Sequence, residues 1–233
     1  MQKIFTYAAA SIALLSLTTA TSHAQQLRAL GVSGSFNVAR LHTGQSEFQL
    51  GSVMVDPLFD QSNDETGNGV TLFGRWQLGH GGWYAQPELG YVSTLETPLN
   101  ISYQRGSFSF APHDRLRHFD VRLLAGYQSG PLRLFAGPSV GYFLRFDPPS
   151  FPDPEVQAVM QALHTPPTRV QAALQAGVGV SLWRLDVNAR YEWGLTQYSR
   201  TVRFQQESRY LNRNLQQLIL EVGFRFYNRP ASQ

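Results

Sequence analysis

The sequence predicts an all-β fold: a closed antiparallel barrel of about eight strands that spans a membrane. Three observations support this fold class. Apolar and polar residues alternate with a period of two over most of the chain, as in a β-strand with two unlike faces. The connections between the alternating segments are short and long in strict turn. The charged residues of these segments fall together on the face opposite the apolar one.

The first 24 residues are predicted to be a cleaved secretory signal peptide. Lys3 supplies the positive start, Ile4–Leu17 the apolar stretch, and Ser22–Ala24 the small residues before the cleavage site. Removing it leaves 209 residues (233 − 24), which is the size of a single barrel domain over residues 25–233.

Composition excludes several classes of function. Of the 19 lysines and arginines, only Lys3 is a lysine, so 18 arginines face 16 acidic residues in the mature chain. That near balance argues against a nucleic-acid partner. Zero cysteines exclude disulfides, thiol catalysis and cysteine-based zinc sites. After residue 24, no apolar run approaches the ~20 residues that a membrane helix needs.

Alternation of apolar and polar residues defines each predicted strand. In the fourth, for example, Phe119, Val121 and Leu123 share one face, and Asp120 and Arg122 share the other. The predicted strands are residues 30–38, 70–78, 83–91, 119–127, 132–144, 170–182, 185–193 and 217–226. Their apolar faces begin, in the same order, with Leu30 and Val32, Val70 and Leu72, Trp83 and Ala85, Phe119 and Val121, Leu132 and Leu134, Val170 and Ala172, Leu185 and Val187, and Leu218 and Leu220.

The connections divide into two kinds. Three are short turns, at Gly79–Gly82, Ser129–Pro131 and Trp183–Arg184. Four are long, at roughly residues 41–69, 93–118, 146–168 and 196–214. Outer-membrane barrels have short periplasmic turns and long extracellular loops, so both termini are expected in the periplasm.

Prolines follow the same division, with two exceptions. Most lie in the long connections, whereas Pro87 and Pro138 fall inside predicted strands, where we expect β-bulges. In the third long connection, four apolar residues have helical spacing and predict one short amphipathic helix, with a proline-bounded loop as the alternative: Val156, Val159, Met160 and Leu163.

The polar face is predicted to line the lumen of the barrel. It carries six basic and five acidic residues: Arg75, Glu88, Asp120, Arg122, Arg133, Arg145, Asp186, Arg190, Glu192, Glu221 and Arg225. An eight-stranded barrel is just wide enough for side chains to fill it, so paired charges would plug the lumen. The alternative is a narrow solute path lined by the same groups.

Aromatic residues lie toward the predicted strand ends on the apolar face. Interfacial girdles are the expected use of such rings, and an aromatic-ligand site is the alternative. These residues are Trp76, Trp83, Tyr91, Tyr127, Tyr142, Tyr191, Trp193 and Phe226.

No enzyme motif is present, and we expect no catalytic, cofactor-binding or metal-binding residues. Of the mature histidines, His113 and His118 are the one pair near ligand spacing, and solvated loop histidines are the preferred interpretation. His113 and Asp114 could serve a hydrolase dyad only with a nucleophile close in space. The fourth long connection is rich in arginine and could meet lipopolysaccharide phosphates, or simply be solvated: Arg200, Arg203, Arg209 and Arg213.

Four runs of the second half share glycines, aromatic residues and inward charges: Asp120–Tyr127, Leu134–Tyr142, Leu185–Leu195 and Leu220–Phe226. With Gln86–Tyr91, they resemble the PorT-like outer-membrane β-barrel family over about residues 27–227. The resemblance implies an outer-membrane barrel domain and no defined activity, although one branch of the family is associated with type IX secretion. The first long connection and residues 228–233 depart from the family pattern.

We therefore expect an integral outer-membrane protein of a Gram-negative bacterium, with a structural or binding role and no catalysis. The expected partners are outer-membrane lipid and lipopolysaccharide, the barrel-assembly machinery and other envelope proteins. The alternatives are a porin-like narrow channel or small-ligand carrier, an accessory subunit of a secretion system, and a soluble periplasmic barrel of lipocalin type. The last would need an apolar lumen and a charged surface.

Overall fold

The computed structural model describes the strands of the chain and parts of their connections. The described residues are 25–43, 48–50, 53–57, 65–79, 81–95, 99–103, 106–110, 115–144, 153–154, 156–158, 170–196, 198–204 and 207–229. The predicted signal peptide, residues 1–24, and the predicted lumen residue Arg145 lie outside them.

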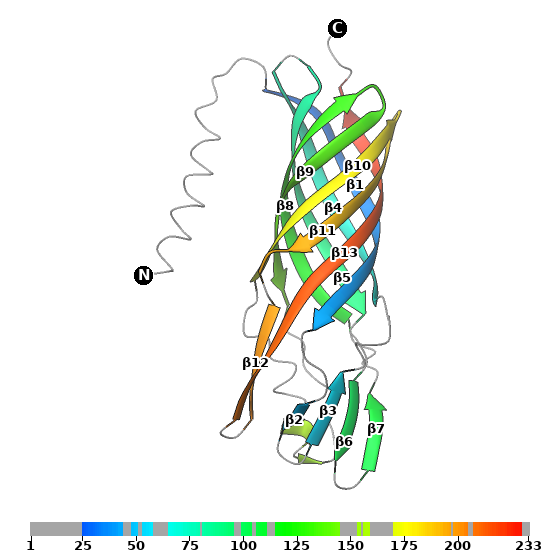
Figure 1. The fold of residues 1–233 in the computed structure, drawn as a ribbon. Coiled ribbons are helices and arrows are strands. Elements are labelled where there is room, and N and C mark those ends of the chain that lie inside the picture. Colours follow the sequence, from blue (N-terminus) through cyan, green and yellow to red (C-terminus); the bar gives the residue numbers. More distant parts are fainter. Residues whose placement is uncertain are drawn as a thin grey trace, which may run out of the picture.

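Eight strands form a closed barrel, because the first pairs with the last (Figure 1). All neighbours are antiparallel. In barrel order the strands are β1 (Gln25–Thr43), β4 (Glu65–Leu78), β5 (Trp83–Leu95), β8 (Arg115–Ser129), β9 (Leu132–Phe143), β10 (Val170–Leu182), β11 (Leu185–Gly194) and β13 (Glu207–Asn228). The predicted fold class and all eight strands are confirmed.

The three short turns lie at one end of the barrel, together with the start of β1 and the end of β13. We call this the turn end and the opposite one the loop end. Gly79 and Gly130 have φ of 68° and 56°, a backbone region that glycine adopts without strain. Trp183 also has a positive φ, 51°, and is 81% exposed beside Arg184 in the β10–β11 turn.

Apolar side chains cover the outside of the barrel, and polar side chains fill the inside. Along β9, Leu132 and Leu134 are exposed on the outside, whereas Arg133 and Phe135 are buried inside. A small apolar cluster of Tyr84, Leu124 and Phe135 is also buried there. The period-two alternation thus separates an apolar outer surface from a polar interior.

Two groups of outward aromatic rings lie near the two ends of the barrel. Trp83 contacts Tyr127 near the turn end, with ring centroids 5.4 Å apart. Tyr91 and Phe119 make a similar contact at 5.3 Å, and Phe119 pairs with Tyr142 in the strand register. Trp83 and Tyr91 are eight residues apart on β5, so about 27 Å of strand separates the two groups.

Five further strands form within connections that we predicted only as long loops. A separate sheet has the order β2-β3-β6-β7, with β2 (Phe48–Leu50), β3 (Val53–Pro57), β6 (Leu99–Tyr103) and β7 (Gly106–Phe110). β12 (Tyr198–Phe204) pairs with the first part of β13, so the arginine-rich connection is a hairpin that extends the barrel wall (Figure 1). Describing these segments as loops was wrong, because each of them is a paired strand. β2 pairs with β3, β6 with β7 and β12 with β13, and the β3–β6 pair joins the first two long connections.

The predicted helix lies partly within the described residues. Residues 154 and 156–158 are helical, and Val156 is buried. The Val156 N–H donates to Asp153 Oδ1 at 3.3 Å, which is an N-cap contact. Val159, Met160 and Leu163 lie outside the described residues. Among the described residues, no helix is long and apolar enough to cross a membrane.

The expected bulges at Pro87 and Pro138 do not form. β5 and β9 keep one register on both sides of these prolines. The shifts within the described barrel pairs lie instead in β1, between Leu27 and Gly31. A proline lacks the N–H group that would donate a hydrogen bond to one neighbouring strand. The residue pairs on either side of it still keep the two strands in register.

Candidate functional site

The barrel interior contains ten of the eleven predicted lumen residues. Each is only 1–7% exposed, although each carries a formal charge. They are Arg75, Glu88, Asp120, Arg122, Arg133, Asp186, Arg190, Glu192, Glu221 and Arg225. Five basic and five acidic groups make the described interior neutral overall, but the two signs are not evenly distributed.

Arg190 bridges opposite walls of the barrel. It extends from β11, and its Nη1 donates to Glu88 Oε2 of β5 at 2.8 Å. β5 and β11 are four steps apart in the closed order of eight strands, so they face each other across the full diameter. Arg190 also donates to Glu221 of β13 and, at 3.3 Å, to Gln175 Oε1 of β10. One guanidinium therefore joins opposite walls across the middle of the interior.

Carboxylates outnumber arginines on the loop side of the interior. We define the acidic cluster as Arg122 and Arg190 with Glu88, Asp120, Glu192 and Glu221. Arg122 donates to Asp120 at 2.7 Å and lies 3.3 Å from Glu88. Glu192 accepts hydrogen bonds from three neutral side chains: Ser139 at 3.0 Å, Gln217 at 2.5 Å and Gln175. With two arginines and four carboxylates, the acidic cluster has a net formal charge of about −2.

Arginines outnumber carboxylates on the turn side. Asp186 lies 2.9 Å from Arg75 Nη2, 3.4 Å from Arg133 Nη2 and 3.5 Å from Arg225 Nε. We define these four residues as the arginine cluster, and its net formal charge is about +2. The Arg75 guanidinium also lies over the ring of Tyr84, 5.2 Å from the centroid.

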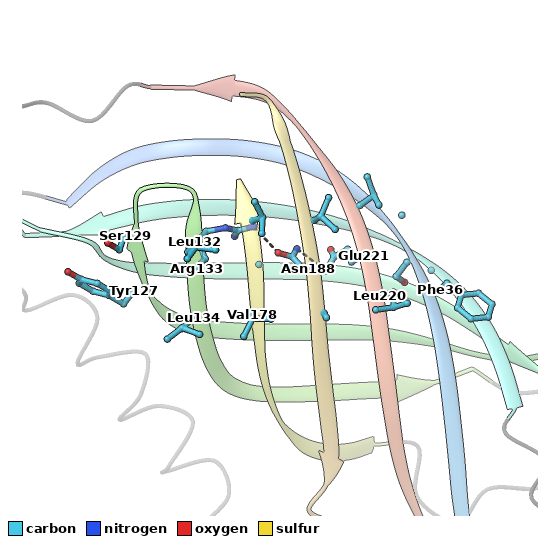
Figure 2. A pocket seen from close by; sticks show the side chains of 18 residues that line it. Phe36, Tyr127, Ser129, Leu132, Arg133, Leu134, Val178, Asn188, Leu220 and Glu221 are labelled. Atoms are coloured by element: carbon cyan, nitrogen blue, oxygen red, sulfur yellow. Dashed lines mark hydrogen bonds between the residues drawn. The ribbon is translucent and has the colours of Figure 1, made fainter. Parts of the chain in front are cut away.

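Two neutral amides connect the clusters. Gln86 accepts from Arg75 Nε at 2.7 Å and donates to Glu88 Oε1 at 2.7 Å. Asn188 accepts from Arg133 Nη2 at 2.7 Å and donates to Glu221 Oε2 at 3.4 Å (Figure 2). An amide oxygen accepts and its nitrogen donates, so each amide is oriented by an arginine on one side and a carboxylate on the other. Sequence reasoning missed these residues, although their inward position in the alternation could have indicated them.

Gly179 of β10 lets Arg133 reach Asn188 across the strand between them. A Cβ at position 179 would collide with Asn188 Oδ1 and lie 3.1 Å from Arg133 Nη2. The interior glycines therefore determine which polar side chains can meet.

Replacing Gly179 with valine is expected to lower the free energy of unfolding by about 1–3 kcal/mol, through overpacking and the loss of the Arg133–Asn188 hydrogen bond. Urea unfolding in lipid vesicles would measure this. Gly34→Val is the matched control: Gly34 is exposed on the outside, and a Cβ there meets nothing within 4 Å. The control should be neutral or slightly stabilising, and equal losses in both variants would contradict the role of the interior contact.

His118 is buried inside the barrel, so its interpretation as a solvated loop histidine was wrong. Its Nε2 lies 3.4 Å from Asp120 Oδ1, and its ring is 4.9 Å from that of Phe143. His118, Asp120 and Glu192 help to line a cavity of about 10 Å³, roughly the space that one water molecule needs. His113 lies outside the described residues. Within the described part of the chain, no group of three or more His, Cys, Asp or Glu side chains could hold a metal ion.

A hollow also lies on the outer face of the barrel, rather than in the lumen. Its volume is about 1140 Å³, and outward residues such as Leu134, Val178 and Leu220 form most of its lining (Figure 2). Because these side chains are exposed outside the barrel, the hollow belongs to the apolar outer surface.

No family model matches the sequence, and no curated protein is similar to it. Similar solved structures include the outer membrane protein OprG from Pseudomonas aeruginosa, at 12% identity and a TM-score of 0.49, covering 88% of this chain and 98% of that one. Outer membrane protein W from E. coli is similar at 16% and 0.45 (85% and 99% covered), and Neisserial surface protein A at 10% and 0.44 (86% and 99%). None of these matches names the PorT-like family, so that narrower assignment stays a prediction from the sequence. Identities this low carry no information about substrate or partner.

Proposed function

We propose that this protein is an integral outer-membrane barrel with an occluded lumen and a structural or binding role. The single observation that carries the proposal is the inverted distribution of side chains. Leu134, Val178 and Val222 are 61%, 54% and 57% exposed on the outside, while ten charged residues are buried inside. A water-soluble barrel would place these classes the other way round, because exposed apolar surface costs free energy in water. In hydrocarbon, a closed barrel with an apolar outside is one of the two stable arrangements of the backbone.

The occluded lumen supports binding rather than passage. Arg190 and Glu88 join opposite walls, and Arg122 and Glu221 contact the same pair from the sides. A solute would have to break these buried contacts to pass. The loop end, with its separate sheet and the β12–β13 hairpin, is then the surface that meets partners outside the cell. In the hairpin, Arg200 and its neighbouring arginines suit the anionic phosphates of lipopolysaccharide.

The proposal also includes three further points: insertion by the barrel-assembly machinery, cleavage of residues 1–24, and a partner in the cell envelope. The sequence runs shared with the PorT-like family support the narrower assignment. The same orientation would put the turn end, where β1 begins and β13 ends, in the periplasm.

Cell fractionation and a heat-modifiability gel test the proposal. We expect the protein in the outer-membrane fraction, with a compact band before boiling and a slower one afterwards, because a detergent-resistant barrel stays folded until heated. The untreated and boiled halves of one sample are each other's control. A soluble periplasmic protein without a shift would overturn the proposal.

Planar bilayers separate an occluded barrel from a channel. We expect no discrete conductance from the wild type. Conductance steps that change when Arg122 or Arg190 is made neutral would instead support the channel alternative.

A further inference from the structure

The arginine cluster has more positive charge than its own carboxylate can neutralise. Arg75, Arg133 and Arg225 all converge on Asp186, and the structure records no second carboxylate in direct contact with them among the described residues. Arg75 and Arg133 also donate hydrogen bonds to the amides of Gln86 and Asn188, which carry no charge. Arginine does not give up its proton in a protein, so the excess cannot be removed by titration.

Unused donors accompany this excess charge. Within the described residues, Arg133 Nε and Nη1 make no hydrogen bond of good geometry, although Arg133 is only 1% exposed and lies close to the Tyr84 hydroxyl. Arg225 Nε is likewise without a hydrogen bond, at 3.5 Å from Asp186 Oδ1. A buried charged donor without a partner is costly, and a ligand that accepts from it removes that cost.

The cluster lies next to the turn-end mouth. Arg133 and Asp186 are the second residues of β9 and β11. Arg225 Nη1 donates to Asn228 at the end of β13, and Arg225 also donates to the Trp183 carbonyl in the β10–β11 turn. The Arg225 side chain is 8% exposed, the most of the three arginines. From this end, the way to the cluster does not cross the Arg190–Glu88 contact.

We propose that the arginine cluster binds an anionic oxygen group, a phosphate or a carboxylate, at the turn-end mouth of the barrel. The ligand oxygens accept hydrogen bonds from the unpaired donors of Arg133 and Arg225. Their negative charge offsets the positive charge that Asp186 does not neutralise. Guanidinium groups suit these planar or tetrahedral oxyanions. Two sources share this chemistry: a free ion and the headgroup of an anionic lipid. The anion site depends on the proposed function in one respect only, which is the side of the membrane on which the turn-end mouth opens.

Titration of the purified full chain with inorganic phosphate, in a neutral detergent at constant ionic strength, tests the site. We expect saturable binding, read from ³¹P NMR line broadening and from tryptophan fluorescence. Arg133→Gln should weaken binding at least about tenfold, the value of one charge-assisted hydrogen bond. Asp186→Asn should tighten it, because the substitution removes the competing carboxylate. A purely structural role for these residues would not produce opposite shifts.

Arg184→Gln is the matched control. Arg184 is exposed in the turn beside the same mouth, so its loss should change the affinity less than about twofold. Should Arg133→Gln fail to fold, Arg225→Gln replaces it, because Arg225 is less buried. No saturable binding by the wild type, or an equal loss from Arg184→Gln, would overturn the proposal.

Lipid nanodiscs separate the two sources. A fluorescence change in phosphatidylglycerol but not in phosphatidylcholine, reversed by added phosphate, would assign the site to a headgroup. Equal behaviour in both lipids, with phosphate binding retained, would assign it to a free ion. Heat-modifiability of the same samples shows independently whether the barrel is folded in the membrane. A wrong anion site and a wrong membrane assignment therefore give different results.

Discussion

Arg190→Gln is expected to reduce the free energy of unfolding by about 3–5 kcal/mol, the usual cost of removing one partner from a buried ion pair. Arg190 is 1% exposed and contacts Glu88, Glu221 and Gln175. Without it, the acidic cluster would hold four carboxylates against Arg122 alone. These charges face each other across an interior that excludes bulk water, so their repulsion is weakly screened.

Urea unfolding in lipid vesicles, followed by the heat-modifiable band, measures this loss. The variant Glu88→Gln/Arg190→Gln should be less destabilised than the sum of the single variants, by about 0.5–3 kcal/mol, because the second change removes a carboxylate that the first leaves unpaired. Arg184→Gln, at an exposed turn, should stay within about 0.5 kcal/mol of the wild type. Strict additivity of the two interior changes would show that Arg190 and Glu88 do not act as a pair.

Val178→Arg on the outer face is expected to cost about 2–4 kcal/mol, the price of a cation at the bilayer midplane of a β-barrel. Val178 is 54% exposed and lies in the middle of β10. Its neighbours on the same face, Leu174 and Leu182, are also exposed. An arginine there must bend toward the interface or bring water into the hydrocarbon.

Leu182→Arg is the control for depth. Leu182 ends β10 on the same face, four residues closer to the turn end, so an arginine there can reach the interface at a cost of about 0–1 kcal/mol. Refolding into vesicles of one lipid composition compares the two variants. A water-exposed Val178 would tolerate arginine within about 0.5 kcal/mol, and that result would contradict the membrane assignment.

The barrel was predictable because each of its strands repeats one local rule. The alternation around Arg133 in β9 assigns every residue to the outside or the inside without reference to other strands. Short turns such as Trp183–Arg184 then force antiparallel neighbours. The separate β2-β3-β6-β7 sheet was missed because its strands are only three to five residues long, too short for the alternation to stand out. β12 was missed because its arginines are also typical of a solvated loop.

His118 shows a different limit. In the sequence it adjoins a long connection, and only the extension of β8 back to Arg115 brings it into the wall. Where a strand begins depends on its neighbours, since β5 reaches Leu95 and pairs with β8 down to that point. The burial of His118 beside Asp120 follows from that pairing.

The fold class, the strands of the barrel and the set of charged residues on its inner face can be read from the sequence alone, because these follow from a period of two along one strand. Which of these charges pair with one another depends on how the strands are arranged in space. Arg190 and Glu88 are 102 residues apart, and they pair because closure places β11 opposite β5. The same closure separates the arginine cluster from the acidic cluster, since contacts across a barrel depend on strand order and stagger, which no single strand contains.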